Sequence, residues 1–378
     1  MPSDTDAWLT LARAPGLGAT LAGRLLDRYG DAGAVLAAGP AAWREAGVPA
    51  AAREAMAHPD EAALARDRSW LERPDADLIT RDDPRYPAAL RDSAQPPPWL
   101  FALGDTDLLA VPGFAIVGSR NPTPAGLAHA RDFGAAMARA GFAVVSGLAA
   151  GIDTAAHEGA LEADGMTIAV CGTGLDRVYP ARNRDLARRI AARGLLVSEF
   201  VPGTEPRPGH FPRRNRVIAG LCVGTLVVEA ARTSGSLITA RLALEAGREV
   251  FALPGAVDNP LARGCHRLIR EGAKLVESSA DILEEIAPQL APAPENPPRR
   301  AAETDTGTAP DDDYRRLLDA LRGGPATVDT VVERTGLTAE AVSSMLLIME
   351  LRGLVAPTSE GAFQRTGDAR AAGASDDS

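Results

Sequence analysis

The sequence predicts an α/β protein in which a parallel, helix-covered sheet is flanked by an N-terminal helical domain and a C-terminal winged helix. Three observations predict this fold class. Residues 113–287 alternate short apolar strands with helical segments, which is typical of a parallel sheet. Residues 7–68 place apolar side chains at helical spacing. Beyond a Pro-rich stretch, three short helical segments and a hairpin pattern follow within 313–367.

Length and composition limit the class of protein. The 378 residues are enough for two or three domains, and the hydrophobic content of 46% is usual for a globular chain. The formal net charge of -10 argues against coating nucleic acid by bulk attraction, although a local patch can have the opposite sign. Three distant cysteines support neither a disulfide framework nor a zinc ribbon. With no signal-peptide pattern and no run of about 18 apolar residues, we expect a cytoplasmic protein without membrane contact.

The composition shifts along the chain predict its domain limits. We expect a helical domain at 1–70, an irregular connector at 71–112, the sheet domain at 113–287, a Pro-rich linker at 288–312, the winged helix at 313–367 and a disordered tail at 368–378. In the helical domain, the Gly16-Leu17-Gly18 turn joins two helices and can present N–H groups to a DNA phosphate. A packing or protein-contact role is the favoured alternative there.

Seven apolar runs predict the strands of the sheet. They lie at 114–117, 142–145, 167–170, 195–198, 223–228, 249–253 and 273–276. The first two end in turns of small residues, Gly118-Ser119 and Ser146-Gly147, each followed by a helix. Such turns gather at the carboxyl edge of a parallel sheet, where the N-termini of the following helices favour negative charge. The sequence therefore predicts an anionic ligand at this edge.

The turn at Gly118-Ser119-Arg120 offers a hydroxyl, backbone N–H groups and a guanidinium for a phosphate. A plain tight turn with a surface arginine is an equal alternative. The spacing matches neither a dinucleotide fingerprint nor a P-loop, so hydride transfer and nucleotide hydrolysis lose support. Asp153 and His157, four residues apart, suit an acid-base or metal pair, but helix capping and packing are favoured for them. We expect no catalytic residue, metal or cofactor.

The strongest charge feature lies between Arg177 and Arg216, where ten arginines face three acids. Within it, Phe211 stands beside Arg213, Arg214, Asn215 and Arg216. Guanidiniums for phosphates and a ring for a base are what single-stranded nucleic acid needs. The alternative is a solvated helix face with Phe211 in the core, and the neighbouring edge turns favour nucleic acid.

A third edge turn, Thr233-Ser234-Gly235, follows the strand that ends near Glu229. Its hydroxyls and N–H groups can contact phosphate, cap the next helix, or do both. In the winged helix, by contrast, the recognition helix beginning at Thr338 has a single arginine and more glutamates than arginines. Such a helix repels phosphate, so contact with protein is at least as well supported as reading of a DNA groove.

Several motifs together resemble the DNA-processing protein A family, DprA, also called Smf. They are GFAIVGSR, VVSGLAAGIDTAAHEGAL, IAVCGTGLDRVYPARNRDL, SEFVPG, HFPRRNRVIAGL, EAARTSGSLITARLALEAGREVFALPG and GCHRLIREGAKLV, and they cover essentially all of 113–287. The N-terminal helices, which are SAM- or helix-hairpin-helix-like, and the winged helix resemble the family's variable extensions. One departure is His266, where the family motif has Asn.

The resemblance implies an extended Rossmann-like domain that binds single-stranded DNA and forms a homodimer. It implies protection of incoming single strands in natural transformation and loading of the RecA recombinase, in some cases with displacement of single-strand-binding protein. By motif, it implies phosphate contacts for Gly118, Ser119 and Arg120, and base stacking for Phe211. Arg213 to Arg216 become the basic element beside the pocket, and Ser146, Gly147 and Thr233 to Gly235 become pocket-lining turns.

Two other functions are weighed against this one. Similar Rossmann-like folds include nucleotide phosphoribohydrolases, which carry a Pro-Gly-Gly-x-Gly-Thr loop and a downstream Glu; here EAARTSGSLITA stands in its place. The other alternative is a transcription regulator built on the winged helix, but it leaves the large sheet domain unexplained. Both alternatives are disfavoured.

Overall fold

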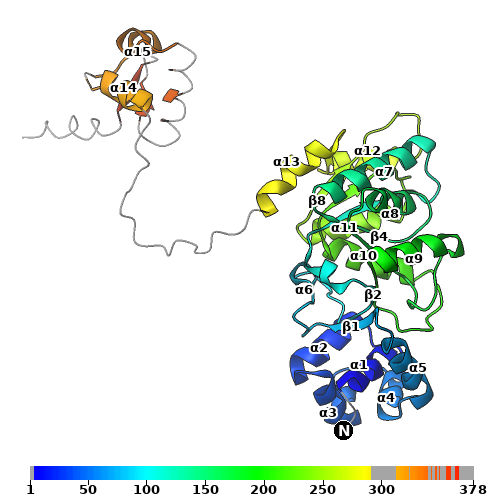
Figure 1. Ribbon diagram of the computed structural model, residues 1–378. Helices are drawn as coiled ribbons and strands as arrows, with labels where there is room; N and C mark the ends of the chain where they lie inside the picture. The colour runs from blue at the N-terminus through cyan, green and yellow to red at the C-terminus, as the bar shows by residue number, and fades with distance from the viewer. Residues whose placement is uncertain are drawn as a thin grey trace, which may run out of the picture. The chain divides into compact units, whose positions relative to one another are not determined.

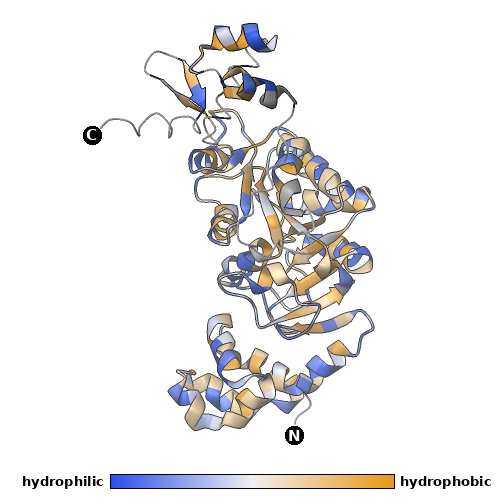
Figure 2. Cartoon of the chain, turned by 90° about the vertical axis from the view of Figure 1, so that its left-hand side faces the viewer, coloured by the Kyte–Doolittle hydropathy of each residue, from blue (hydrophilic) through white to orange (hydrophobic). Residues whose placement is uncertain are grey.

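The computed structural model describes residues 4–290 and, beyond them, residues 312–322, 324–338, 342, 345–346, 349, 355–358 and 362–365. The chain divides into two compact units, residues 1–291 and residues 292–378. Helices and strands carry the labels of Figure 1 from here on. Figure 2 colours the same chain by hydropathy, and the strands of the larger unit are mainly apolar while its helices mix apolar and polar residues.

A nine-stranded sheet forms the centre of the larger unit, in the order β1-β2-β6-β5-β4-β3-β7-β8-β9 (Figure 1). Its parallel strands are β3 (Gly113–Val117), β4 (Ala143–Ser146), β5 (Thr167–Val170), β6 (Leu195–Ser198), β7 (Cys222–Val227), β8 (Glu249–Ala252) and β9 (Lys274–Leu275). Each matches a predicted strand to within one residue at either end. The predicted alternation of strand and helix is therefore confirmed.

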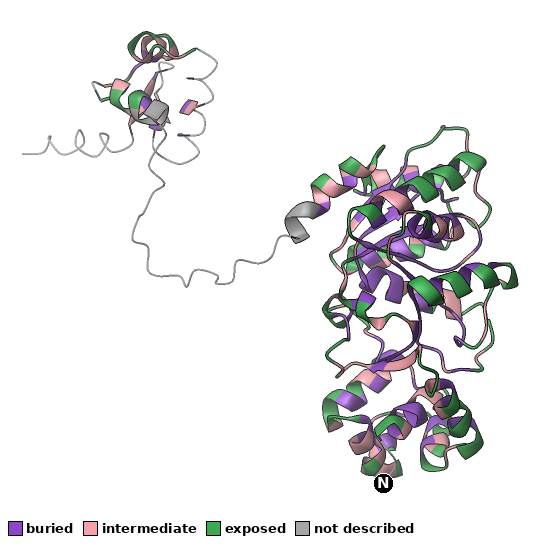
Figure 3. Cartoon of the chain, viewed as in Figure 1, coloured by how far each residue is buried: buried purple, intermediate pink, exposed green. Residues whose placement is uncertain are grey.

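Helices cover both faces of the sheet, which explains why strands such as β3 are buried along their whole length (Figure 3). Phe114 and Ile116 of β3 pack with α7 (Pro124–Arg139) and α8 (Ile152–Glu162). Ala115 and Val117 point to the other face, where α10 (His210–Gly220), α11 (Ser236–Glu245) and α12 (Arg263–Arg270) lie. The first face is completed by α9 (Arg184–Arg193) and α13 (Ser279–Leu290).

The prediction of an irregular connector at 71–112 is wrong. This segment forms two strands, β1 (Ala76–Thr80) and β2 (Trp99–Gly104), that extend the sheet in antiparallel pairing beyond β6. It also holds the short helix α6 (Ala88–Arg91) and a 3-10 turn at Thr106–Ala110. The prolines at 96–98 do exclude helix locally, but they immediately precede a strand that begins at Trp99.

Five helices build the N-terminal domain: α1 (Asp4–Arg13), α2 (Ala19–Tyr29), α3 (Ala32–Glu45), α4 (Ala50–Ala57) and α5 (Glu61–Leu71). They pack on the antiparallel extension through aromatic contacts. The rings of Trp8 and Trp99 meet edge-on with centroids 6.5 Å apart, and those of Trp70 and Phe101 meet at 6.0 Å. The helical domain and the sheet therefore share one core.

The smaller unit contains α14 (Asp312–Ala320), α15 (Val328–Thr335) and a two-stranded sheet of β10 (Val355–Pro357) and β11 (Phe363–Arg365). Its core includes Leu317, Val331, Val342 and Met349. Most of the expected recognition helix, most of the Pro-rich linker and the expected tail lie outside the described residues. The linker's predicted start at 288 is corrected, because α13 continues to Leu290.

Candidate nucleic-acid interface

The candidate site lies beside the central strand β3, where the order of strands in the sheet reverses. From the central strand β3 the chain moves outward through β4, β5 and β6, and then returns to place β7 on the other side of β3. In open α/β sheets, ligands bind at the carboxyl ends of the strands beside such a point. A cavity of about 570 Å³ lies there, between the turns that follow β3 and β7 and the first half of α10.

Nine of the thirteen predicted site residues line this cavity: Gly118, Ser119, Arg120, Phe211, Arg214, Asn215, Thr233, Ser234 and Gly235. They come from three stretches that are far apart in sequence. The other four, Ser146, Gly147, Arg213 and Arg216, are outside its lining. Tyr179, Asp153 and Pro208 also line it, although the sequence did not assign them to a nucleic-acid site.

Arg120 and Tyr179 both contact the ring of Phe211 at the cavity. The Arg120 guanidinium carbon lies 5.6 Å from the centre of the Phe211 ring. The centres of the Tyr179 and Phe211 rings lie 5.4 Å apart, with an angle of 37° between the ring planes. Phe211 rests on the backbone of Gly172, where a Cβ would come within 3.0 Å of the ring. Arg120 is exposed and forms no ion pair with the described residues. Its charge is therefore available to an anion.

The turn after β3 is held close to its neighbours. A Cβ at Gly118 would meet Ile152 at 2.7 Å and the carbonyl oxygen of Glu229 at 2.9 Å, so only glycine fits between them. The Ser119 hydroxyl accepts a hydrogen bond from the N–H of Asn121 at 3.1 Å. The Ser119 carbonyl accepts one from the N–H of Ile152 at 3.1 Å. The turn is thus fixed before any ligand arrives.

Arg214 is buried beneath the cavity rather than free within it. It is 4% exposed, and its guanidinium donates to the carbonyl of Gly147 at 2.6 Å and also to that of Val170. Asp153, 7% exposed, accepts from the N–H of Gly147 at 3.0 Å and from that of Ala149 at 3.3 Å. Burial lowers the pKa of Arg214 and raises that of Asp153, and their opposite charges partly offset both effects.

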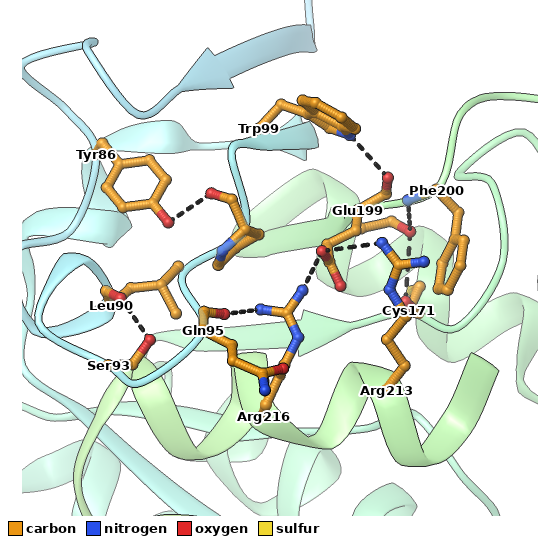
Figure 4. Close-up of polar contacts among 12 residues, drawn as sticks. Tyr86, Leu90, Ser93, Gln95, Trp99, Cys171, Glu199, Phe200, Arg213 and Arg216 are labelled. Atoms are coloured by element: carbon orange, nitrogen blue, oxygen red, sulfur yellow. Dashed lines mark hydrogen bonds and ion pairs between the residues drawn. The ribbon is translucent and has the colours of Figure 1, made fainter. Parts of the chain in front are cut away.

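Arg213 and Arg216 face away from the cavity, toward Glu199 at the end of β6 (Figure 4). Arg216 binds the carboxylate of Glu199 and the carbonyl of Gln95, and its side chain is 11% exposed. Arg213 reaches the same Glu199 oxygen at 3.5 Å and lies over the ring of Phe200 at 5.4 Å. Helix α10 therefore has its arginines on two faces. Arg214 lies on the cavity face with residues 211, 215 and 218, and Arg213 and Arg216 lie on the face toward Glu199.

The turn after β7 supplies hydroxyls to the cavity lining. Ser234 and Ser236 share a hydrogen bond between their hydroxyl oxygens at 2.7 Å, and Thr233 is exposed. Asn215 donates to the carbonyl of Gly235 at 3.4 Å, which links α10 to this turn. Glu229, in contrast, accepts from the N–H and the hydroxyl of Thr123 at 2.8 and 2.6 Å. Glu229 thereby helps to cap α7.

The remaining candidate groups have structural partners. Ser146 is fully buried and donates to the carbonyl of Ile116 at 2.6 Å. His157 is also fully buried, with Nδ1 at 2.7 Å from the hydroxyl of Thr167, and burial lowers its pKa to about 3. His157 thus packs and hydrogen-bonds as expected, whereas Asp153 binds the loop before α8 and does not cap that helix, whose N-cap is Gly151. Within the described part of the chain there is no cluster of metal-ligating side chains, and no helix is long and apolar enough to span a membrane.

Sequence reasoning missed Tyr179 and the role of Glu229. Tyr179 follows the Gly-rich turn after β5, and an aromatic residue in that position was the available signal in the sequence. For Glu229 the only available signal was a carboxylate at the end of a strand. Its bonds to Thr123, 106 residues away, depend on β3 and β7 being neighbours in the sheet. That pairing is a tertiary relationship, which no local pattern encodes.

Three family models match the chain. The model described as DNA recombination-mediator protein A matches residues 77–287, which is more than half of the chain. The DprA-like N-terminal HHH domain matches residues 2–63, and the DprA winged helix domain matches residues 287–361. The chain belongs to the DprA/Smf family. The resemblance found in the sequence motifs is confirmed, as is the fold class with its two flanking domains.

Relatives of known structure or name support the same DprA/Smf membership. Protein Smf from Synechocystis is 40% identical over 317 residues, covering 76% of this chain and 80% of Smf. The solved structure of DNA processing protein A from Streptococcus pneumoniae is 39% identical, with a TM-score of 0.67 over 74% of this chain and 97% of that one. DNA processing protein A from Helicobacter pylori, whose structure is described for its single-stranded DNA binding mode, is 30% identical. Its TM-score is 0.52 over 57% of this chain and 96% of that one.

His266, the departure from the DprA motif, lies outside the cavity lining. Its Nε2 is 3.0 Å from the carbonyl oxygen of Gly255, in the loop between β8 and α12. The histidine at this position therefore contacts the loop between β8 and α12 and does not line the cavity.

Proposed function

We propose that this DprA/Smf protein binds single-stranded DNA at the cavity between the turns after β3 and β7. The observation that carries the proposal is that the cluster of Arg120, Phe211 and Tyr179 lines the same cavity as the hydroxyl-rich turn at Thr233 to Gly235. A cation and aromatic faces next to one another suit a phosphate and a base without selecting a sequence. The related Helicobacter pylori protein, described for its single-stranded DNA binding mode, supports the same ligand here.

The proposed roles differ among the predicted residues. Arg120 pairs with a phosphate, and the backbone and hydroxyls of Ser119 and of the Thr233 turn bind neighbouring phosphate oxygens. Phe211 and Tyr179 stack with a base. Arg214, Ser146 and Gly147 support the cavity floor, because each is buried and already hydrogen-bonded. Arg216 fixes α10 to Glu199, and Arg213, the arginine of that pair with the more exposed side chain, binds the same carboxylate on the face of α10 away from the cavity.

We further propose that the bound strand is protected and passed to the RecA recombinase during DNA transformation or recombination. The family description as a recombination mediator supports this step. A homodimer, and displacement of single-strand-binding protein, belong to the same proposal. RecA filament assembly on strands coated with single-strand-binding protein tests the transfer, and sedimentation equilibrium tests the dimer. Filaments that grow equally fast without the protein would contradict the transfer.

Fluorescence anisotropy with a labelled single strand, compared with the same sequence as a duplex at several salt concentrations, tests the binding site. We expect preferential binding of the single strand that weakens as salt rises, because phosphate contacts release counterions. Arg120→Ala is expected to weaken that binding, whereas Arg139→Ala, an exposed arginine at the opposite end of α7, serves as the matched control. Equal affinity of both variants and the wild type for single strands would contradict the site.

The phosphoribohydrolase alternative requires a carboxylate that is free to act at the strand ends. Three carboxylates near these strand ends have partners among the described residues, although the buried Oε2 of Glu199 has none. Asp153 binds two backbone N–H groups, Glu229 binds Thr123, and Glu199 binds two arginines. These contacts favour structural roles for all three, and we keep DNA binding as the proposed function.

A further inference from the structure

Helix α9 carries an arginine-rich outer face that the proposed cavity does not use. Its ten residues include Arg184, Arg188, Arg189 and Arg193 against a single acid, Asp185. All four arginines are exposed, and Figure 3 shows the helix with an exposed outer side. Arg188 and Arg193 form ion pairs with exposed carboxylates, whereas Arg184 and Arg189 form none with the described residues. A chain of net charge -10 thus concentrates positive charge on one helix.

This helix begins at the rim of the cavity. Tyr179 lines the cavity, and Arg184 opens α9 five residues later. Between them, Asn183 is 5% exposed and donates to the carbonyls of Leu148 at 2.9 Å and Ala149 at 3.3 Å. Because Ala149 also lines the cavity, the first turn of α9 is fixed to the cavity wall. From that rim the helix runs about 15 Å along the face of the sheet unit.

The charge spacing along α9 suits an extended polyanion. Arg184 and Arg188 are four residues apart and so lie on one line of the helix, and Arg189 and Arg193 form a second line beside it. Arginines whose guanidiniums are exposed bind phosphate oxygens without sequence preference. The exposed pair of Arg188 with Asp185 is weak in water and gives little opposition to a phosphate.

We propose that the outer face of α9 binds the phosphate backbone of the DNA strand as it leaves the cavity past Tyr179. This inference rests on the proposed function, because it extends the cavity's contact with the same strand. The cavity holds one or a few nucleotides, and α9 adds contacts that only a longer strand reaches. Affinity and salt dependence therefore increase with strand length through Arg184 and Arg189.

The test compares strands of about 6 and about 25 nucleotides, binding to wild type and to the double variant Arg184→Gln/Arg189→Gln. The matched control is Arg66→Gln/Arg139→Gln, which removes two exposed arginines of α5 and α7 that likewise form no ion pair with described residues. For the long strand, we expect the α9 variant to bind about three- to tenfold more weakly at moderate salt. Its salt slope should fall by about 1.4, because each phosphate that is no longer neutralised lowers the slope by about 0.7.

The short strand separates this inference from the proposed function. We expect the α9 variant and the wild type to bind it equally, because it fills only the cavity. An α9 variant whose long-strand affinity and salt slope equal those of the control would overturn the α9 inference while leaving cavity binding intact. Wild-type protein that binds neither strand would overturn both. Circular dichroism spectra that match wild type establish that each variant is folded.

Discussion

Arg214 and Asp153 bind opposite ends of the same residue, Gly147. The arginine donates to the Gly147 carbonyl at 2.6 Å, and the carboxylate accepts from the Gly147 N–H at 3.0 Å. A Cβ at Gly147 would come within 2.5 to 2.6 Å of the guanidinium, so the turn after β4 has no room for a side chain. A buried cation and a buried anion thus fix the turn that lies under the cavity.

Replacing Arg214 with Ala should lower the free energy of unfolding by about 3 kcal/mol. The substitution leaves two carbonyls without donors and the buried Asp153 charge uncompensated. Urea unfolding at pH 7 measures the loss. Arg213→Ala on the same helix is the control and should cost no more than about 1 kcal/mol, because that side chain is 39% exposed. A variant of Arg214 that keeps wild-type stability but loses DNA affinity would instead make this residue a direct contact.

Arg120 and Phe211 should respond differently to salt. Arg120→Ala removes a phosphate contact, so single-strand affinity should fall together with a decrease of about 0.7 in the salt slope. Phe211→Ala should weaken binding by about 1–3 kcal/mol with the slope unchanged, because stacking releases no counterion. Anisotropy titrations at four or more salt concentrations measure both quantities. A larger decrease in slope for Phe211→Ala than for Arg120→Ala would reverse the assigned roles.

His157 should make the large unit less stable below pH 6.5. Thr167 donates its hydroxyl to the carbonyl of Val144, so His157 Nδ1 is the donor to Thr167, and buried Nε2 has no partner in the described structure. Because the folded pKa of His157 is about 3 and its ordinary value is 6.5, the unfolded chain binds the proton first as pH falls. This contribution to stability is complete above pH 6.5 and is lost progressively down to about pH 3.

The measurement is urea unfolding at pH 7 and pH 5. His157 should account for a loss of about 2 kcal/mol between these values. His157→Asn keeps a donor for Thr167 but does not titrate, so it should lose about 2 kcal/mol less than wild type over the same interval. The raised pKa of Asp153 acts in the opposite direction, but it is common to both proteins and cancels in the comparison. Equal losses in the two proteins would refute the assignment.

Helices α7 and α8 approach each other through glycine. A Cβ at Gly159 would lie well under 3.0 Å from the carbonyl oxygen of Arg131, and one at Gly134 would also lie under 3.0 Å from the carbonyl oxygen of Ala156. Gly159→Ala should therefore push the helices apart and lower the free energy of unfolding by about 2 kcal/mol or more. Gly23→Ala, in helix α2 with open space around it, should be neutral or stabilising by up to about 1 kcal/mol. Thermal and urea unfolding distinguish the two.

The parallel strands could be predicted from sequence because each is a short apolar run that ends in a turn of small residues. Strands β1 and β2 could not, since the prolines before Trp99 and the charged turn at 81–85 resemble a connector. What makes β2 a strand is its antiparallel pairing with β6, whose residues lie about a hundred positions later. Long-range pairing of this kind leaves no local periodicity.

The grouping of the candidate residues around one cavity was predicted more completely than their individual contacts. Edge turns such as Gly118 to Arg120 carry their own signal, because their position follows from the strands before them. The sequence grouped Arg213, Arg214 and Arg216 as one basic element, yet the helix sends Arg214 inward and the other two toward Glu199. The helical repeat of 3.6 residues predicts that these arginines point in different directions. Only the fold shows that Glu199 lies beside Arg213 and Arg216.

The antiparallel extension also decides how short a working fragment can be. Every residue that lines the cavity lies between 117 and 239, so a fragment beginning at residue 113 would retain them all. It would nevertheless leave β6 as an open edge without β2, and such edges recruit strands from other molecules. A fragment beginning at residue 72 would keep β1 and β2 but would bare Trp99 and Phe101 to water. The helices before residue 72 therefore cover an apolar part of the sheet, and we expect a fragment that lacks them to be less soluble than one that includes them.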